Sequence, residues 1–376
     1  MKNRFLAIIL VAVSTAPAAA QVQSILIEAG TPEDAAIQAI TKESDDAKRL
    51  AMWEEFVAKY ASSPAAVAYG DSQIAQHYLS AGDAAKALAY GDKAMAAVPN
   101  NLDILMSQTM AAQQLKDNAK IMGYASLGGK AISGIKKAPA PPGVEAADWA
   151  SKLEGQRQLV QQQFEFFDGA AFNAVAAEQN AKKRVEYAQK YDESFSDGRY
   201  IDQVHQLAIT GLLQAQDFTA LAKYGEAALA ASPNNVATLS LLAYALAEDP
   251  NPRNPYLARA MEHARKAVGL GKADAPETDR TIKLSVGLAH EALGYALMKQ
   301  DKTAAAISEF KSASDLLKDD PGSQEVVLFR LGYAYAKLKR YAEAREALNA
   351  TIALKGPFEK QARDVLAKVN AAGTAR

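Results

Sequence analysis

The chain has 376 residues, 49% of them hydrophobic and 23% charged, which is enough apolar material for a folded body. Its 42 Lys and Arg residues nearly balance its 43 Asp and Glu residues, and this argues against a nucleic-acid partner because such proteins usually carry a clustered basic excess. Without cysteine, it has no disulfide, no thiolate metal site and no cysteine nucleophile. Alanine dominates the composition and favours helix.

Residues 1–20 have the pattern of a bacterial signal peptide. Lys2 and Arg4 precede an apolar run at 5–13, and Ala18-Ala19-Ala20 provides an A-x-A cleavage site. We expect cleavage before Gln21 and a periplasmic or secreted protein. An uncleaved anchor is the alternative, but the run is shorter than the ~20 residues of a membrane span. No later segment is apolar enough, so we expect no membrane span.

Residues 31–135 read as three successive helix-turn-helix copies that start at residues 34, 68 and 102. Thr31 before Pro32 has the pattern of a helix N-cap. The second copy matches best among these three, with Gly82 at the turn between its helices and Pro99 at its end. The third has four glycines in its second helix, and each weakens a helix by roughly 1 kcal/mol relative to alanine.

Residues 136–148 interrupt this series. The stretch 138–143 reads APAPPG, and prolines at that density are incompatible with a helix interior. Two interpretations stay open at this point. The segment is either a linker between two subdomains or a long loop inside one continuous array.

Residues 149–372 are predicted to hold a polar helix at 149–163, five further copies and a final capping helix at 359–372. The segments 90–101 and 224–235 match at eight of twelve positions, and each joins the end of one copy to the start of the next. A proline ends one helix there and an asparagine caps the following one. The copy at 236–274 carries an insertion at 248–255 with three prolines.

The copy at 325–358 is the clearest of all. It places Leu331, Gly332, Tyr335 and Ala344 where a packed helix pair needs large and small side chains, with apolar Leu348 following. This order resembles the 34-residue tetratricopeptide pattern, W-x₂-L-G-x₂-Y…A-x₃-F…P. The weaker copies extend the resemblance over roughly 34–372.

The resemblance to tetratricopeptide-repeat proteins implies a fold and a use. The fold is all-α, a TPR-type α-α superhelix or solenoid of about eight helix-turn-helix repeats. Its concave face is lined by the first helix of each repeat and usually receives a peptide or protein segment. The physics agrees, because a single repeat cannot bury its apolar face and must stack on its neighbours.

The sequence contains no complete copy of the catalytic motifs considered below. His290-Glu291-Ala292-Leu293-Gly294 begins like the zinc motif H-E-x-x-H but has glycine at the second histidine. The stretch 128–131, GGKA, lacks the Ser or Thr that would hold magnesium in a phosphate loop. No G-x-S-x-G elbow is present. We therefore predict no catalytic residue, no metal site, no cofactor and no enzyme activity.

The family geometry turns repeat positions 2, 5, 6, 9, 12 and 13 toward the concave face. Projected onto this chain, the expected partner-binding residues are Gln73, Gln76, Met106, Met110, Gln113, Gln206, Gln214, Tyr244, Tyr295, Phe329 and Tyr333. We expect an uncharged lining of amides, thioethers and aromatic rings, which suits an adaptable polypeptide surface. The alternative is that many of these side chains only pack against the adjacent repeat.

The sequence therefore favours a non-catalytic periplasmic scaffold that binds a polypeptide segment of unknown identity in its concave groove. The alternative is a small-molecule or glycan binding module, which would use Tyr244, Tyr295, Phe329 and Tyr333 as a stacking platform. The sequence leaves the partner and the oligomeric state open.

Overall fold

The computed structural model describes residues 22–135, 137–273 and 279–374. All eighteen elements found there are α-helices, as predicted, and these residues form no strand. Contacts divide the chain into two compact units, one ending at residue 178 but including 186–201, the other comprising 179–185 and the residues from 202 onward. The leader at 1–20 lies outside the described residues, so its cleavage stays a prediction.

Within the described ranges, no helix combines the length and the apolar character that crossing a membrane requires.

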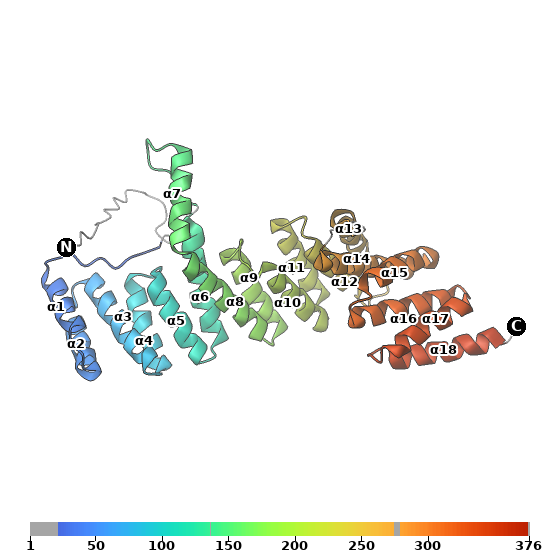
Figure 1. The fold of residues 1–376 in the computed structure, drawn as a ribbon, viewed down its shortest axis with the longest axis horizontal. Helices are drawn as coiled ribbons and strands as arrows, with labels where there is room; N and C mark the ends of the chain where they lie inside the picture. Colours follow the sequence, from blue (N-terminus) through green and yellow to red (C-terminus); the bar gives the residue numbers. More distant parts are fainter. Residues whose placement is uncertain (1–21, 136, 274–278, 375–376) are drawn as a thin grey trace. The chain divides into compact units, whose positions relative to one another are not determined.

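The first unit is built of helix pairs that follow one another along the chain (Figure 1). Its helices, including the shared α9, are α1 Pro32–Thr41, α2 Asp46–Lys59, α3 Pro64–Ser80, α4 Ala84–Ala97, α5 Leu102–Gln114, α6 Asn118–Ile135, α7 Ala146–Leu159, α8 Gln161–Ala177 and α9 Ala181–Ser194. The pairs α1/α2, α3/α4, α5/α6 and α8/α9 correspond to the first four predicted copies. The first helices of successive copies also touch, α3 with α5 and α5 with α8.

Helix starts in this unit are fixed by side chains that accept a backbone hydrogen bond. Thr31 Oγ1 accepts from Asp34 N at 3.2 Å, which confirms the predicted N-cap of α1. Asn101 Oδ1 accepts from Ile104 N at 3.1 Å at the start of α5. Such caps satisfy amide groups that the first turn of a helix leaves free.

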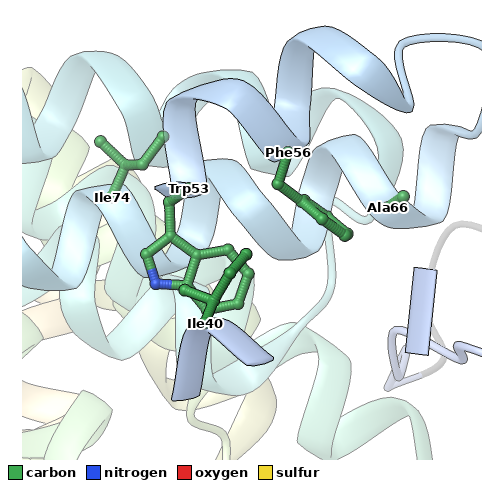
Figure 2. Close-up of a cluster of buried hydrophobic side chains, with 5 residues drawn as sticks. All are labelled: Ile40, Trp53, Phe56, Ala66 and Ile74. Carbon is green, nitrogen blue, oxygen red and sulfur yellow. The ribbon is translucent and has the colours of Figure 1, made fainter. Parts of the chain in front are cut away.

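The apolar core at the start of the first unit joins three helices. Ile40 of α1, Trp53 and Phe56 of α2, and Ala66 and Ile74 of α3 are all buried together (Figure 2). Trp53 and Phe56 meet edge to face with ring centroids 5.5 Å apart. Trp53 is therefore a core residue, and the first predicted copy packs properly despite its weak match to the repeat pattern.

Helix α6 runs unbroken through all four of its glycines, contrary to the weakness that local propensity suggests. A Cβ atom on Gly128 would lie 2.4 Å from the ring of Phe167, and one on Gly129 would lie 2.4 Å from Phe195. These glycines give two aromatic rings access to the α6 backbone. Tertiary packing thus offsets the local cost.

The polar helix predicted at 149–163 ends earlier. The backbone leaves helical geometry at Val160, with φ −110° and ψ 17°, so α7 stops at Leu159 and α8 starts at Gln161. Residues 137–148 and α7 belong to the first unit, and α8 packs directly against α5 and α6. These contacts favour the long-loop interpretation of the proline-rich segment, while the proposed subdomain boundary itself stays a prediction.

The second unit continues the helix pairs (Figure 1). Its helices are α10 Ile201–Gln214, α11 Phe218–Ala231, α12 Val236–Ala247, α13 Leu257–Gly271, α14 Arg280–Lys299, α15 Thr303–Leu317, α16 Pro321–Lys337, α17 Tyr341–Ala353 and α18 Glu359–Thr374. The first helices again form a row, with α12 against α14, α14 against α16 and α16 against α18. α18 also packs on α17, with Ala362 and Val369 buried, and its role as a capping helix stays a prediction.

The turns between paired helices repeat one backbone feature. A residue with positive φ occurs at the same place in five copies: Gly82, Lys116, Gln216, Asp301 and Lys339. Each is the fifteenth residue of its predicted copy, counted from residues 68, 102, 202, 287 and 325, which confirms the repeat register. Only Gly82 adopts this conformation without steric cost, so the packing of the two helices holds the four non-glycine residues there.

Small residues lie where the helices of a pair cross. A Cβ on Gly332 of α16 would come within 2.7 Å of Leu348 Cγ on α17. Gly294 of α14 faces Phe310 of α15 in the same way, also at 2.7 Å. The close backbone approach predicted from the motif at 325–358 is therefore present.

Candidate functional site

The first unit has a pocket on the surface made by the first helices of its repeats. It has a volume of about 370 Å³ and lies between α3 and α5. Gln73 and Gln76 of α3 line it, facing Ser107 of α5. Gln76 is exposed and Gln73 half-buried, so both predicted residues lie at a surface open to solvent.

An extended segment of the chain, residues 22–28, lies against this pocket. Residues 22–25 form part of its lining. Gln23 N donates to Asn100 O at 3.2 Å, and Asn100 N donates to Gln23 Oε1 at 3.0 Å. Asn101 Nδ2 donates to Gln23 O at 3.1 Å. The residues that begin α5 therefore recognise the backbone and the amide side chain of Gln23 together.

The other predicted residues of the first unit lie farther along α5. Met106 is half-buried, whereas Met110 is 42% exposed and Gln113 is exposed. None of the three lines the pocket, but they continue the same helix from it. In this unit the predicted residues lie on two adjacent helices, and all of them are uncharged.

In the second unit the predicted residues are more dispersed. Gln206 and Gln214 are exposed on α10. Tyr333 of α16 is 47% exposed. Phe329, also on α16, is half-buried and packs on Phe358, with ring centroids 5.0 Å apart. The structure gives Phe329 a packing role between α16 and the segment that leads into α18.

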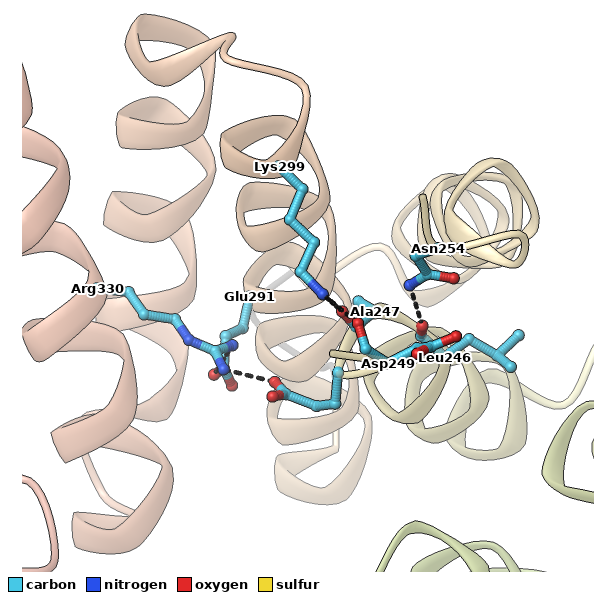
Figure 3. Close-up of polar contacts among 8 residues, drawn as sticks. Leu246, Ala247, Asp249, Asn254, Glu291, Lys299 and Arg330 are labelled. Atoms are coloured by element: carbon cyan, nitrogen blue, oxygen red, sulfur yellow. Dashed lines mark hydrogen bonds and ion pairs between the residues drawn. The ribbon is translucent and has the colours of Figure 1, made fainter. Parts of the chain in front are cut away.

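Tyr244 and Tyr295 come together around a charged residue that was not predicted. Arg330 of α16 donates to Glu291 Oε1 of α14 at 2.9 Å and to Glu248 Oε1 after α12 at 2.5 Å (Figure 3). Its guanidinium lies 3.9 Å from the Tyr295 ring centroid and 6.0 Å from that of Tyr244. The guanidinium thus donates to two carboxylates and lies beside two aromatic rings.

Lys299 of α14 extends this cluster to the insertion that follows α12. Its Nζ donates to Ala247 O at 2.7 Å and to Asp249 O at 2.6 Å (Figure 3). The same ammonium lies 4.6 Å from the Tyr295 ring centroid. Asn254 Nδ2 donates to Leu246 O at 2.8 Å and fastens the other side of the loop. The insertion is therefore held by the first helices of the next two repeats.

Burial and charge shift the ionisation of this cluster in opposite directions. Burial raises the pKa of the Glu291 carboxyl to about 7, although Arg330 lowers it. Burial lowers the pKa of Arg330, but Glu291 and Glu248 together raise it by more, so the guanidinium stays charged. Burial also lowers the pKa of Lys299. One guanidinium serves two carboxylates, and the burial of Glu291 favours the protonated form of that carboxyl.

Among the described residues, no three His, Cys, Asp or Glu side chains gather as a metal site would require. His290, which opens the partial zinc motif, has its Nδ1 2.7 Å from Glu309 Oε2 on α15. Glu291 of the same motif points to Arg330. Both side chains therefore take part in contacts between helices.

Comparison with protein families decides what the repeats are. Residues 297–369 match the tetratricopeptide repeat family. The chain carries tetratricopeptide repeats at these residues. The match covers α15–α17 with the end of α14 and most of α18, and the same pairing of helices recurs in the described parts of both units. No curated protein matches the chain at the sequence level.

Solved tetratricopeptide-repeat structures resemble the chain at low sequence identity. A chain of the APC/C heterotetramer Cut9–Hcn1 is 13% identical with a TM-score of 0.42, and the match covers 90% of this chain and 56% of that one. The P58(IPK) TPR domain is 14% identical with a TM-score of 0.30, over 91% and 98% of the two chains. The yeast Sti1 TPR2AB domain in its pHSP90 complex is 14% identical with a TM-score of 0.25, over 81% and 98%. This chain therefore spans just over half the length of the first of these.

The expectation of a wholly uncharged tetratricopeptide-repeat lining is wrong for the second unit. The inward positions that predicted Tyr244, Tyr295 and Tyr333 also include Glu248, Glu291, Lys299 and Arg330. Sequence reasoning had the signal, because all four charged residues lie at the repeat positions that face inward. A single charged residue in a helix is normally interpreted as solvent-exposed unless its partner is known. The two partners of Arg330 lie 39 and 82 residues away in the sequence, so the cluster was not recognised.

Proposed function

We propose that this chain is a non-catalytic protein-interaction scaffold whose first unit binds an extended polypeptide segment on the surface formed by α3 and α5. One observation carries the proposal. Residues 22–28 of the chain itself lie in an extended conformation against this surface, and Gln23 forms backbone hydrogen bonds there. A surface that holds one such segment offers the contacts that another would use.

The composition of the surface supports a polypeptide ligand. Gln73 and Gln76 offer amide groups that pair with a peptide backbone in either direction. Met110 adds a side chain that repacks easily against different residues. The leader motif at residues 1–20 supports the further proposal that binding takes place in the periplasm or outside the cell.

The alternative ligand, a small molecule stacked on aromatic rings, has less support. The Tyr295 ring is already contacted by Arg330 and by Lys299, at 3.9 and 4.6 Å from its centroid. Phe329 packs on Phe358. Of the four rings considered for this role, Tyr333 alone is largely exposed. One open ring is a poor stacking platform for a glycan.

The test is a triple variant, Gln76→Glu, Met110→Glu and Gln113→Glu. All three side chains are exposed, so we expect the helical circular dichroism signal and the melting temperature to change little. A bound segment would have to cover these carboxylates without a basic match, which opposes association by several kcal/mol if they become buried. We expect the partners captured by the parent from envelope extract to be lost, as identified by mass spectrometry.

The matched control places the same three charges on the second helix of a repeat. Ala85→Glu, Ala89→Glu and Ala96→Glu change exposed positions of α4, away from the pocket. This variant should capture the same partners as the parent. If the first triple variant also melts like the parent and still captures them, the surface of α3 and α5 is not the binding site.

A further inference from the structure

Residues 23–28 alternate in burial as an extended peptide in a groove does. Gln23, Ile25 and Ile27 are half-buried, whereas Ser24, Leu26 and Glu28 are exposed, Leu26 to 80%. Side chains of an extended chain point to opposite faces in turn, so one face of this segment lies on the protein and the other faces solvent. Its contact face consists of one amide and two isoleucines.

The segment is held at two places. Gln23 makes the three hydrogen bonds to Asn100 and Asn101 at the start of α5. Ile27 packs against the buried cluster that contains Trp53 and Phe56. Between these two points, Ile25 lines the pocket beside Gln73. The three inward residues therefore contact, in order, the start of α5, the pocket between α3 and α5, and the buried cluster of α1, α2 and α3.

The pocket disfavours a charged ligand. Besides Asp103, its lining contains no Asp, Glu, Lys, Arg or His. Its amide and hydroxyl groups pair with neutral backbone and amide groups, and its apolar side chains suit aliphatic residues. An acidic segment would meet Asp103 and no cation, and a basic one would find a single partner.

From these observations, and resting on the proposed function, we infer that residues 22–28 are a resident competitor for the partner-binding groove. We also infer the chemistry of the partner: an extended, uncharged segment with Gln or Asn at one position and aliphatic residues two and four positions later. Such a segment binds by displacing residues 22–28. A short tether keeps the resident segment at an effective concentration on the order of mM, so it weakens partner binding without abolishing it.

The experiment measures binding of a labelled, uncharged peptide with the sequence of residues 22–27, acetyl-Val-Gln-Ser-Ile-Leu-Ile-amide, by fluorescence polarisation. The full chain is compared with its Gln23→Pro variant, which lacks the backbone N–H and the side-chain Oε1 that bond to Asn100. We expect the variant to bind the peptide at least 10-fold more tightly than the parent. A control peptide with serine in place of both isoleucines should bind at least 10-fold more weakly than the first. Equal binding by parent and variant, or no binding by the variant, would overturn the inference.

A second measurement follows displacement directly. The chain has no cysteine, so Leu26→Cys provides a single thiol for a spin label at an exposed position of the segment. The peptide should make the label more mobile, and the serine control peptide should not. A label whose mobility is unchanged at a peptide concentration that saturates binding would mean that residues 22–28 stay in place, and the competitor role would be wrong.

Failure of this inference is distinguishable from failure of the proposed function. If the triple glutamate variant loses its protein partners while no peptide of this type binds Gln23→Pro, the scaffold function stands and the inferred ligand chemistry is wrong. If the triple variant keeps its partners, the proposed function itself is wrong, whether or not the peptide binds.

Discussion

The first helices of the repeats carry different chemistry in the two units. In the first unit they present amides and hydroxyls around an open pocket. In the second unit they present Arg330, Glu291 and Lys299, whose hydrogen bonds are made to one another or to the loop after α12. Polar groups at the same repeat positions are thus available to a ligand in the first unit, whereas in the second unit they form hydrogen bonds within the protein.

This difference separates binding from stability. A side chain that contributes to a surface need not be ordered before the ligand arrives, whereas a buried charge must be paired at all times. We therefore expect substitutions in the second-unit cluster to change folding, and substitutions around the first-unit pocket to change association.

The largest effect is expected for Arg330→Ala. At pH 8, above the pKa of about 7 of Glu291, this carboxylate is 1% exposed and would lose its cation, and removing one member of a buried ion pair typically costs about 3–5 kcal/mol. Denaturant unfolding followed by circular dichroism should show this loss. Lys337→Ala on the same helix removes an exposed pair to Asp301 and should cost no more than about 1 kcal/mol. Similar losses for the two variants would show that the cluster does not stabilise the second unit.

Overpacking one helix crossing should have the next largest effect. Gly332→Leu would push a side chain into Leu348, where a Cβ alone would already lie 2.7 Å from Cγ. We expect a loss of roughly 1–3 kcal/mol in unfolding free energy. The control is Gly322→Leu on the same helix, where the nearest atom to a Cβ is 3.8 Å away. Unchanged melting for Gly332→Leu would contradict the packing of α16 on α17.

The repeat fold could be predicted from the sequence because its signals are local. Position, period and residue size gave the helix pairs, the turn at Gly82 and the crossing at Gly332, all of which the structure confirms. The continuity of α6 could not be predicted locally, because it depends on rings from Phe167 and Phe195. Helix propensity alone was a poor guide there.

The candidate site was less predictable. Positions in the 34-residue repeat predicted Gln73 and Gln76, which line the pocket, but no periodic pattern connects residues 22–28 to α5. The segment precedes the first repeat and has no place in the 34-residue pattern. The Arg330 cluster was missed for a related reason, since it needs the insertion after α12 to bring Glu248 to it.

The stability of the second unit should depend on pH through Glu291. Glu291 has a folded-state pKa of about 7, above its ordinary value of 4.5, so the folded state binds a proton that the unfolded state has already released. Its contribution to stability is full below about pH 4.5 and is lost as pH rises through 7. The melting temperature of the parent relative to Glu291→Gln should therefore fall between pH 5 and about 8. Parallel melting curves over this range would contradict the raised pKa.

The smallest effect on stability is expected for Asn101→Asp, which tests how the first unit holds its extended segment. The Asn101 side chain has two roles, because Oδ1 caps α5 and Nδ2 donates to Gln23 O. Aspartate keeps the capping acceptor and adds a negative charge, which is favourable at a helix N-terminus. It loses the donor and places a carboxylate near the Gln23 carbonyl. A neutral hydrogen bond contributes roughly 0.5–1.5 kcal/mol, so melting should change little while the segment is released.

Hydrogen–deuterium exchange at residues 22–28 measures that release. It should become faster in Asn101→Asp, since the bond from Gln23 N to Asn100 O is no longer supported by its neighbour. The equivalent asparagine of the second unit, Asn235, also caps its helix, but its Nδ2 donates to Asp202 at 2.5 Å. Asn235→Asp should therefore leave exchange at 22–28 unchanged and should destabilise the second unit by opposing two carboxylates. If Asn101→Asp leaves the exchange of residues 22–28 as slow as in the parent, the Asn101 amide does not hold the segment, and Ile27 in the Trp53 cluster becomes the contact to test.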